Sequence, residues 1–514
     1  MNRKGVTAAQ LLRELALDWR RDAAEDLFEL WTTHLHISAE ILDADSVSLT
    51  FLSSLRDIHF RGTDDVPCIL VGGEQSDAGP ALREFQRVVA DPAQLFFVLA
   101  VSDAAAREAR SLFAGSRYVL LGTGQLASLL AAAAPIEALR SAIRASIPIR
   151  SLNPYNILLT PQANMFFGRG PELERLRDED DVSFAIAGPS RIGKSSLVHQ
   201  YRRELRKFAP GRYRSSFYLD LMECTDKSPG ALAHFLAMRL EGSRLSSKVG
   251  LDEFPNFLRR MRSRLGVRVE LVLDEVDSSV ESAFFQTLGE AARNNLCRLV
   301  LCGRGGLLKA ALRSSQRYGC RLDLMRLEPL DVEAARALVL RPLRDLGFEL
   351  QDETSITGQL FELTGRLPYL LQFCLRRLVE VCIVGGAKLL TPEHVRELRW
   401  DYDTAQYFTS PLSDLTDPEC RLVALVLLEL SPDQVDQSTV QQIAASAGLR
   451  LDQERCKEIC NDLFINNILA WRGGSFRMAN KALAHFTRES GYLASAIQEA
   501  RSRAGVAART GEGR

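Results

Sequence analysis

Residues 182–198 read Val-Ser-Phe-Ala-Ile-Ala-Gly-Pro-Ser-Arg-Ile-Gly-Lys-Ser-Ser-Leu-Val. The apolar run 184–187 predicts a buried strand, and the apolar periodicity after Lys194 predicts a helix. Between them, Gly188 and Gly193 frame a loop of the form G-x-x-x-x-G-K-[ST], the P-loop. Glycines let backbone N–H groups surround phosphate oxygens, and the N-terminus of the following helix favours anions. The sequence therefore predicts a nucleotide-binding site here.

The residues of this loop have distinct expected roles. Lys194 is expected to reach the β- and γ-phosphates, and the Ser195 hydroxyl is expected to bind Mg²⁺. The other residues expected to surround the phosphates are Gly188, Pro189, Ser190, Arg191, Ile192, Gly193 and Ser196. ATP and Mg²⁺ are therefore the expected cofactors.

A second motif follows at residues 269–275, which read Val-Glu-Leu-Val-Leu-Asp-Glu. This is an apolar strand that ends in two acids, a Walker B arrangement. Asp274 is expected to hold the Mg²⁺ shell, and Glu275 to orient or deprotonate the attacking water. Many strands end in Asp, so the pattern is informative because of its place after the P-loop.

Length and composition indicate a multidomain globular protein. The 514 residues predict about three domains, and the hydrophobic content of 46% and charged content of 25% are ordinary for a soluble chain. The net charge of −1 gives no global basic field of the kind that attracts nucleic acid. Apolar runs such as 95–101 and 422–428 are too short to span a bilayer, and the N-terminus lacks a signal-peptide core. We expect a cytoplasmic protein without a membrane partner.

The ten cysteines are scattered without C-x-x-C pairs, which argues against a zinc ribbon or a disulfide framework. Cys456 and Cys460 are spaced by one helical turn. We interpret them as small residues on a packed helical face rather than as half of a metal site, since no nearby His completes one.

Residues 1–150 predict a separate α/β module. Residues 7–40 have helical periodicity, and shorter apolar strands then alternate with helices up to residue 145. This alternation predicts a small parallel or mixed sheet. The predicted strands are 66–72, 95–101 and 118–121, and the predicted helices are 81–89, 104–113, 125–132 and 136–145.

The lack of lysine in this module disfavours two functional classes. No lysine occurs between Lys4 and Lys194. A phosphoacceptor receiver needs a lysine at a strand end, and a restriction-type nuclease needs one beside its paired acids, so both classes are disfavoured. Three acids at predicted strand edges, Asp64, Asp65 and Asp103, are interpreted as turn residues. The module is expected to be a non-catalytic sensing or protein-interaction domain.

The order of motifs in residues 165–385 resembles the STAND and origin-recognition-like branches of the AAA+ ATPases. An aromatic-Gly-Arg box ending at Arg169 precedes the P-loop, and Leu-Val-Leu-Asp-Glu-Val-Asp follows it. The C-terminal domain fits the resemblance, whereas the first 150 residues lie outside it. The resemblance implies an ATPase core at 151–325 and a helical lid at 326–405.

The resemblance implies roles for three further residues. Arg169 belongs to the box that adjoins the nucleotide. Arg304 follows the apolar strand 299–303, where the family carries its sensor 1 residue, and Pro368 stands in a segment similar to the G-x-P motif near the adenine. The chain departs from the family where Gly170-Pro171 replaces an acid after Arg169. No arginine finger can be chosen among Arg313, Arg317 and Arg321.

Residues 411–495 predict a winged helix. Helices at 417–430, 438–445 and 452–466 are followed by a hairpin at 468–479. The third helix is the candidate recognition helix, but it carries more acids than bases, whereas a DNA-binding surface needs phosphate contacts. The hairpin adds Arg472 and Arg477, with Lys481 beyond. Packing against the ATPase core explains this unit as well as DNA binding does. Residues 496–514 predict a disordered tail.

The expected architecture is therefore α/β: a small N-terminal α/β domain, a P-loop core with a helical lid, and a winged helix. The expected function is an ATP-binding and ATP-hydrolysing switch, in which Mg-ATP controls domain arrangement for signalling or regulated assembly. The N-terminal module would dock a protein partner or mediate self-assembly. Two alternatives stay open: a DNA-binding origin-recognition-like ATPase, and a nucleotide-stabilised scaffold with negligible turnover.

Overall fold

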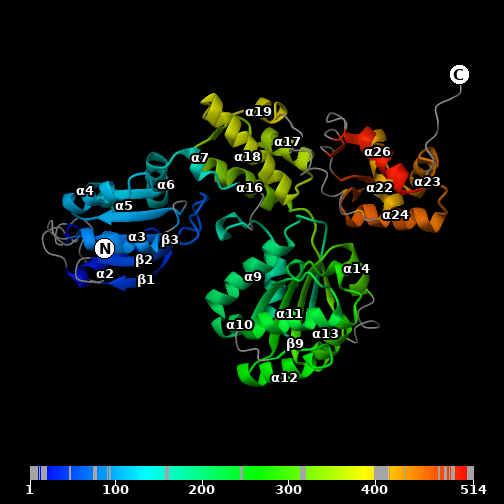
Figure 1. Cartoon of the computed structure of the whole chain (residues 1–514). Coiled ribbons are helices and arrows are strands. Elements are labelled where there is room, and N and C mark those ends of the chain that lie inside the picture. The colour runs from blue at the N-terminus through cyan, green and yellow to red at the C-terminus, as the bar shows by residue number, and fades with distance from the viewer. Residues whose placement is uncertain are drawn as a thin grey trace. The chain divides into compact units, whose positions relative to one another are not determined.

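The computed structural model of the chain forms two compact units (Figure 1). The first unit contains 1–167, 336–356 and 372–396, and the second contains 168–335, 357–371 and 397–514. Apart from isolated positions, the residues that the structure describes are 20–44, 48–72, 78–89, 94–156, 161–242, 247–312, 320–398, 417–432, 434–472, 475–479 and 492–505.

The first unit contains a five-stranded mixed sheet in the order β1-β2-β3-β4-β5. The β1–β2 and β2–β3 pairs are antiparallel, and the β3–β4 and β4–β5 pairs are parallel. The strands are β1 (Ser38–Ala44), β2 (Ser48–Ser54), β3 (Val66–Val71), β4 (Phe96–Ala100) and β5 (Tyr118–Gly122). The helices are α2 (Arg21–His34), α3 (Ala78–Val88), α4 (Asp103–Leu112), α5 (Thr123–Ala131), α6 (Pro135–Ser146) and α7 (Ile149–Leu152).

Alternate residues of β4 face two helical layers, as the pleat of a strand requires. Phe96 packs in one cluster with Phe85 of α3 and with Phe113. The next residue, Phe97, contacts Trp31 of α2, whose ring centroid lies 6.1 Å away. Both faces of β4 are therefore covered, which explains its uninterrupted apolar sequence.

The beginning of this unit differs from the expected helix over 7–40. Helix α2 ends at His34, and β1 begins at Ser38 and pairs with β2. The leucine spacing before residue 31 is helical, but the β1–β2 pairing is set by contacts between strands, which no local periodicity reports. The prediction is therefore wrong for residues 38–40.

Asp64 has a structural role in the same unit. Its carboxylate accepts the backbone N–H of Asn164 at 2.9 Å and that of Ala163. Asn164 is buried, and its side-chain amide donates to the Ile58 carbonyl and to the Thr63 hydroxyl. Asp64 thus ties the segment before β3 to residues 163–164, a long-range contact that its interpretation as a turn residue did not include.

The second unit contains a five-stranded parallel sheet in the order β10-β6-β9-β8-β7 (Figure 1). Its strands are β6 (Phe184–Ala187), β7 (Ser216–Asp220), β8 (Val269–Asp274), β9 (Cys297–Gly303) and β10 (Asp323–Arg326). Its helices before β10 are α8 (Gly170–Asp178), α9 (Lys194–Phe208), α10 (Pro210–Ser215), α11 (Pro229–Glu241), α12 (Phe254–Leu265), α13 (Ala283–Arg293) and α14 (Gly305–Leu312). Strand β9 lies between the P-loop strand β6 and β8, which carries the two acids.

Helices cover both faces of this sheet. Leu271, Leu273, Leu299 and Leu301 belong to one buried cluster with residues of α11, α12, α13 and α14. The alternate residues of β8 and β9 lie outside that cluster, on the face that α9 contacts. Burial on both faces is typical of parallel sheets, and it leaves the strand ends as the place for polar chemistry.

Further helices follow β10 along the chain. They are α16 (Val332–Asp345), α17 (Glu353–Thr364), α18 (Pro368–Gly385) and α19 (Pro392–Arg396), and the short strands β11 (Glu349–Leu350) and β12 (Leu389–Leu390) pair in parallel. Helices lie where the lid was expected, while the domain boundaries stay predictions. Among the residues described, no helix combines the length and the apolar character that a bilayer crossing needs.

The described residues between 417 and 479 form three helices and a two-stranded antiparallel hairpin, in the predicted order. These elements are α22 (Pro418–Leu430), α23 (Gln437–Ser446), α24 (Gln453–Ile465), β13 (Leu469–Arg472) and β14 (Ser475–Met478). The winged-helix interpretation itself stays a prediction. Residues 473–474, the side chain of Arg472, and Lys481, Arg313 and Arg317 lie outside the described set.

The segment after the hairpin corrects the predicted disordered tail. Helix α26 (Tyr492–Arg503) extends well past residue 496 and packs against α22. Ala496, Ile497 and Ala500 are buried. The sequence around these residues has too few large apolar side chains to predict a core. Packing of α26 against α22 nevertheless buries them. Residues 506–514 lie outside the described set.

Candidate nucleotide-binding site

The carboxyl ends of β6, β8 and β9 meet at one edge of the parallel sheet. Gly303 of β9 pairs with Ala187 of β6, and Leu273 of β8 pairs with Leu301 of β9. The Gly188 N–H donates to the Gly303 carbonyl at 3.2 Å. The P-loop, the two acids and the residue after β9 therefore share one edge, which is where open α/β sheets bind ligands.

The backbone of the P-loop explains its glycines. A Cβ on Gly188 would lie 3.0 Å from Ile192 Cγ2 and 3.2 Å from the Leu327 carbonyl oxygen, which leaves little room for any side chain. Gly193 has a φ of 106°, in the left-handed region that favours glycine. Directly after it, Lys194 begins α9. Pro189 is buried, while Ser190, Ser195 and Ser196 are partly exposed along the loop and the first turn.

Lys194 is a buried cation, with only 5% of its surface exposed. Its Nζ donates to the carbonyl oxygens of Gly188, at 3.0 Å, and Pro189, at 2.9 Å. Burial lowers the pKa of Lys194, because the desolvated ammonium group is less stable than in water. The P-loop thus surrounds the Lys194 ammonium group, which donates hydrogen bonds to two neutral carbonyl oxygens.

Asp274 ends β8 and is 2% exposed. Its Oδ2 accepts the Ser195 hydroxyl at 2.6 Å and the Tyr218 hydroxyl at 3.0 Å, and its Oδ1 accepts the Glu275 backbone N–H at 2.9 Å. The sequence placed Asp274 and Ser195 on the same ion, and the structure places their oxygens in direct contact. Carboxylate and hydroxyl oxygens of this kind are suitable Mg²⁺ ligands.

Glu275 follows Asp274 with a φ of 54°, a left-handed conformation that is uncommon outside glycine. Burial raises the pKa of Glu275, although the charges of Lys194 and Arg304 act in the opposite direction. A carboxyl group with a raised pKa is a better proton acceptor when ionised. Arg304 Nη2 lies 3.6 Å from Glu275 Oε2. The structure therefore brings together two residues that the sequence assigned to separate motifs.

Arg169 contacts the P-loop, whereas Pro368 stands beside the residue that does. Arg169 donates to the Ile192 carbonyl at 3.5 Å and to the Glu328 carbonyl, and it pairs with Glu172 at 3.2 Å. The Arg169 side chain therefore supports the P-loop by a hydrogen bond to the loop's backbone. Pro368 begins α18, and the ring of Tyr369 beside it lies 5.7 Å from the Arg191 guanidinium. The contact between the P-loop and the start of α18 is thus made by Tyr369.

Two polar residues of this site had no assigned role in the sequence. Tyr218 lies on β7, and its hydroxyl contacts Asp274. Burial raises the pKa of Tyr218, so the hydroxyl stays protonated and donates. Asp277, in the turn after β8, accepts the Arg304 backbone N–H at 2.6 Å. Asp277 could have been suspected from its place in Asp-Glu-Val-Asp, whereas Tyr218 belongs to no motif.

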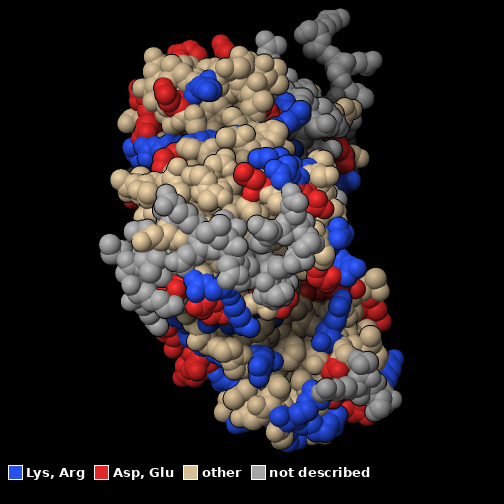
Figure 2. Space-filling model, turned by 90° about the vertical axis from the view of Figure 1, so that its left-hand side faces the viewer, with Lys and Arg blue, Asp and Glu red and all other residues tan. Residues whose placement is uncertain are grey.

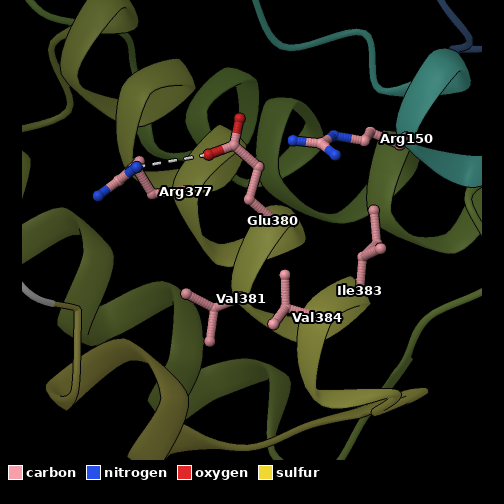
Figure 3. Close-up of a pocket in the computed structure, with 6 residues that line it drawn as sticks. All are labelled: Arg150, Arg377, Glu380, Val381, Ile383 and Val384. Atoms are coloured by element: carbon pink, nitrogen blue, oxygen red, sulfur yellow. Dashed lines mark ion pairs between the residues drawn. The ribbon is translucent and has the colours of Figure 1, made fainter.

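A second concave region lies in the first unit, between α7 and α18 (Figure 3). Its volume is about 360 Å³, and its lining residues are Arg150, Arg377, Glu380, Val381, Ile383 and Val384. Arg377 and Glu380 pair at 3.6 Å, and Val384 is 89% exposed. This groove has an apolar floor and a charged rim but no phosphate-binding loop, so it is not the nucleotide site.

The cysteines make no metal centre within the ranges described. All ten are free thiols, and Cys456 and Cys460 are buried on α24. No three His, Cys, Asp or Glu side chains in these ranges are placed to hold a metal ion. The interpretation of Cys456 and Cys460 as residues of a packed helical face is confirmed.

The family model described as Novel STAND NTPase 1 matches residues 148–486, which include every residue of the site and more than half of the chain. The chain belongs to this family. The predicted P-loop NTPase of STAND type is thereby confirmed, and with it a nucleotide-binding function. The first 147 residues lie outside the match.

Several solved structures are similar to parts of the chain. A Walker-type ATPase of Pyrococcus abyssi is 16% identical, with 65% of this chain and 99% of that chain covered and a TM-score of 0.48. The ORC2 protein of Aeropyrum pernix, in ADPNP and ADP complexes, is 12% identical over 68% and 98%, with a TM-score of 0.46. The ORC1 protein of the same organism, in complex with DNA, is 16% identical over 70% and 97%, with a TM-score of 0.37. At these scores the likenesses add nothing to the family assignment. No curated protein matches the sequence.

Proposed function

We propose that this STAND NTPase binds Mg-ATP at the carboxyl edge of the parallel sheet and hydrolyses it, and that the nucleotide controls the arrangement of its domains. The observation that carries the proposal is the buried Lys194 ammonium group, held inside the P-loop by two neutral carbonyl oxygens. A buried cation without an anionic hydrogen-bond partner is favoured by a bound anion. The γ- and β-phosphates of ATP supply that charge.

The oxygen donors beside the lysine fit a magnesium ion. Ser195 and Asp274 would hold it, since their oxygens already lie 2.6 Å apart, and Tyr218 keeps Asp274 oriented. When bound, Mg²⁺ neutralises phosphate charge and polarises the phosphoryl group. Backbone N–H groups of residues 188–193 and the first turn of α9 would orient the phosphate oxygens. The site therefore supplies both charges and hydrogen bonds for a triphosphate.

Hydrolysis requires a proton acceptor, and Glu275 is the candidate. Its carboxylate is placed at the end of β8 next to Asp274 and can take the proton of an attacking water molecule. Arg304 Nη2 lies 3.6 Å from Glu275 Oε2. During hydrolysis, the Arg304 side chain can move from Glu275 to the phosphate and stabilise the negative charge that develops there. Arg304 would therefore pair with the Glu275 carboxylate before hydrolysis and with the phosphate during it.

The described residues favour a protein output over DNA binding. On α24, the predicted recognition helix, Arg455 pairs with Asp417, with Glu419 at 3.0 Å and with Glu458 at 2.8 Å, so its charge is already neutralised. Figure 2 shows positive and negative side chains interspersed on the face drawn, without one continuous basic surface. Edge strand β1 exposes Ile41 and Leu42 and offers a place for strand addition by a partner or a second copy.

Steady-state ATP hydrolysis by the full chain, with and without duplex DNA, tests the proposal. Glu275→Gln should retain ATP binding and lower turnover by roughly a hundredfold or more, because it removes the proton acceptor. Sedimentation velocity with ATP and with ADP reports any change of assembly. Normal turnover by the variant would remove Glu275 from its role. Turnover stimulated by duplex DNA would instead support the origin-recognition-like alternative, and ATP binding without turnover would support the scaffold.

A further inference from the structure

Asp277 connects the turn after β8 to the helix after β9. It lies in a 3₁₀ turn, Val276–Ser278, directly after the acids of β8. Its Oδ2 accepts the Arg304 backbone N–H at 2.6 Å, and its Oδ1 accepts the Leu307 backbone N–H at 3.1 Å. The first N–H groups of a helix have no partners within the helix, so a carboxylate there both satisfies and fixes them. One side chain therefore ties the start of α14 to the acid-bearing strand.

Two glycines make room for this carboxylate. A Cβ on Gly303 would lie 2.7 Å from Asp277 Oδ2, and a Cβ on Gly306 would lie 2.9 Å from Asp277 Oδ1. At Gly305, between them, the nearest atom to such a Cβ is Ile465 Cγ2, at an ordinary 3.5 Å. The positions that must be glycine are thus those that face Asp277.

The same carboxylate faces the side chain of Arg304. Asp277 Oδ2 lies 4.0 Å from Arg304 Nε, while Glu275 Oε2 lies 3.6 Å from Arg304 Nη2. Asp277 therefore restrains the arginine at both its backbone and its guanidinium group, and directs the far end of the side chain toward Glu275.

We propose that Asp277 is a positioning residue for ATP hydrolysis, which holds Arg304 against Glu275 without contacting the substrate. This inference rests on the proposed function. Asp277 makes turnover depend on the junction of β9 and α14, since any shift of α14 relative to β8 changes the hydrogen bonds that place Arg304. A purely structural carboxylate at the same position would contribute to stability alone.

A double-mutant cycle separates these two roles. Asp277→Asn removes the negative charge and one acceptor, so we expect kcat to fall about tenfold while the Kd for ATP changes by less than about threefold. Arg304→Gln should also lower kcat. If Asp277 acts through Arg304, adding Asp277→Asn to Arg304→Gln should lower kcat little further. Independent, additive losses in the double variant would overturn the proposal.

The neighbouring glycines give a matched pair that leaves the carboxylate intact. Gly306→Ala should displace Asp277 and reproduce the loss of kcat, whereas Gly305→Ala should retain wild-type turnover. Both substitutions add one methyl group to the same helical turn, so their helix propensities change equally. Equal kcat values for the two variants would contradict the proposal.

Binding and turnover of the wild-type chain distinguish failure of the inference from failure of the proposed function. Fluorescent ATP-analogue titration and thermal unfolding of each variant accompany the kinetics. Failure of the wild-type chain to bind ATP would overturn the proposed function itself. ATP binding with no turnover would overturn the hydrolysis part of the proposed function and the Asp277 inference with it, whereas normal wild-type turnover with an unaffected Asp277→Asn would overturn the inference alone. A loss of kcat in Asp277→Asn that follows the fraction unfolded would reduce Asp277 to a structural residue.

Discussion

Two clusters of charged residues lie at opposite edges of the parallel sheet, and they are built in opposite ways. At the amino edge, Glu270 and Arg298 form what we term the closed cluster, together with Tyr201, Ser216 and Arg212. At the carboxyl edge, Lys194, Asp274, Glu275 and Arg304 form the open cluster. Both contain buried charges, but they differ in their hydrogen bonds: Glu270 and Arg298 pair directly, whereas Lys194 donates to neutral carbonyl oxygens.

In the closed cluster, the single carboxylate of Glu270 pairs with two arginines, and each charged group has hydrogen-bond or ion-pair partners within the protein. Arg298 pairs with Glu270 and donates to the carbonyl oxygens of Leu176 at 3.0 Å, Glu179 at 2.9 Å and Val182 at 2.7 Å. Glu270 also accepts the Ser216 hydroxyl at 2.7 Å. Such a network specifies how helices and strands pack, and it leaves nothing for a ligand to do.

In the open cluster, the charged groups are less well satisfied. Lys194 donates to two neutral carbonyl oxygens, and burial shifts the pKa values of Lys194 and Glu275 against their charged forms. The contrast teaches that burial of charge is not by itself a sign of function. A buried cation that donates its hydrogen bonds to neutral carbonyl oxygens, with acids nearby, indicates a site that an anionic ligand completes.

The largest expected effect is on stability, in the closed cluster. Arg298→Met removes the more buried of the two cations that pair with Glu270 and leaves Arg212 at 3.5 Å, so we expect the free energy of unfolding to fall by about 3 kcal/mol in urea denaturation. Adding Glu270→Leu should recover part of this loss, because it removes a buried carboxylate that has lost its closer cation. ATP affinity of the folded fraction should stay unchanged. A large loss of affinity without a loss of stability would break the comparison.

The second effect is on ligand binding, in the open cluster. Lys194→Met removes the cation that meets the phosphates, so ATP affinity should fall by about a hundredfold or more, as measured by fluorescent-nucleotide titration. The ligand-free stability should be maintained or increased, since a poorly solvated charge is replaced by an apolar side chain of similar length. Lys207→Met, at the exposed end of α9, is the matched control and should bind ATP normally. Destabilisation as severe as that of Arg298→Met would show that Lys194 is structural.

The smallest effect is a pH dependence of stability. Because the pKa of Glu275 is raised above its usual value of 4.5, its ionisation destabilises the folded state. The stabilising contribution of the neutral carboxyl is fully present below the unfolded pKa and is lost as pH rises through the folded pKa. Glu275→Gln should therefore gain stability relative to wild type as pH increases over this range. A constant difference between the two proteins from pH 4 to pH 8, by thermal unfolding, would contradict the pKa direction.

The sequence allowed much of the open cluster to be predicted, because its chemistry depends on contiguous residues. A P-loop binds phosphate through the backbone of one short loop, so Gly188 to Ser195 had to appear together, and the strand ending at Asp274 was recognisable by its apolar run. The roles proposed for Glu275, Arg304 and Pro368 stay predictions. Three strands of the core, β6, β8 and β9, and the elements between 417 and 479 follow the predicted order, whereas β7 and β10 were not predicted.

Features that depend on contacts across the sheet could not be predicted. Tyr218 reaches Asp274 from a neighbouring strand, and Arg298 meets Glu270 through the pairing of β9 with β8. The pairing of β1 with β2 and the packing of α26 on α22 are likewise tertiary. Residues distant in sequence carry no joint local pattern, so a single sequence without an alignment does not reveal these partners.

Helix α9 takes part in both clusters, with a consequence for nucleotide exchange. Its first residue is Lys194, and one face holds Tyr201, whose hydroxyl bonds to Glu270 and Arg298, while Arg202 donates to the Ser216 carbonyl at 3.1 Å. The helix is therefore anchored to the sheet before any nucleotide arrives. On our proposal, this anchored helix presents Lys194 and Ser195 to the nucleotide without having to fold, so this part of the site is preorganised. We therefore expect the residence time of the nucleotide to depend on its contacts and on domain rearrangement rather than on refolding of α9.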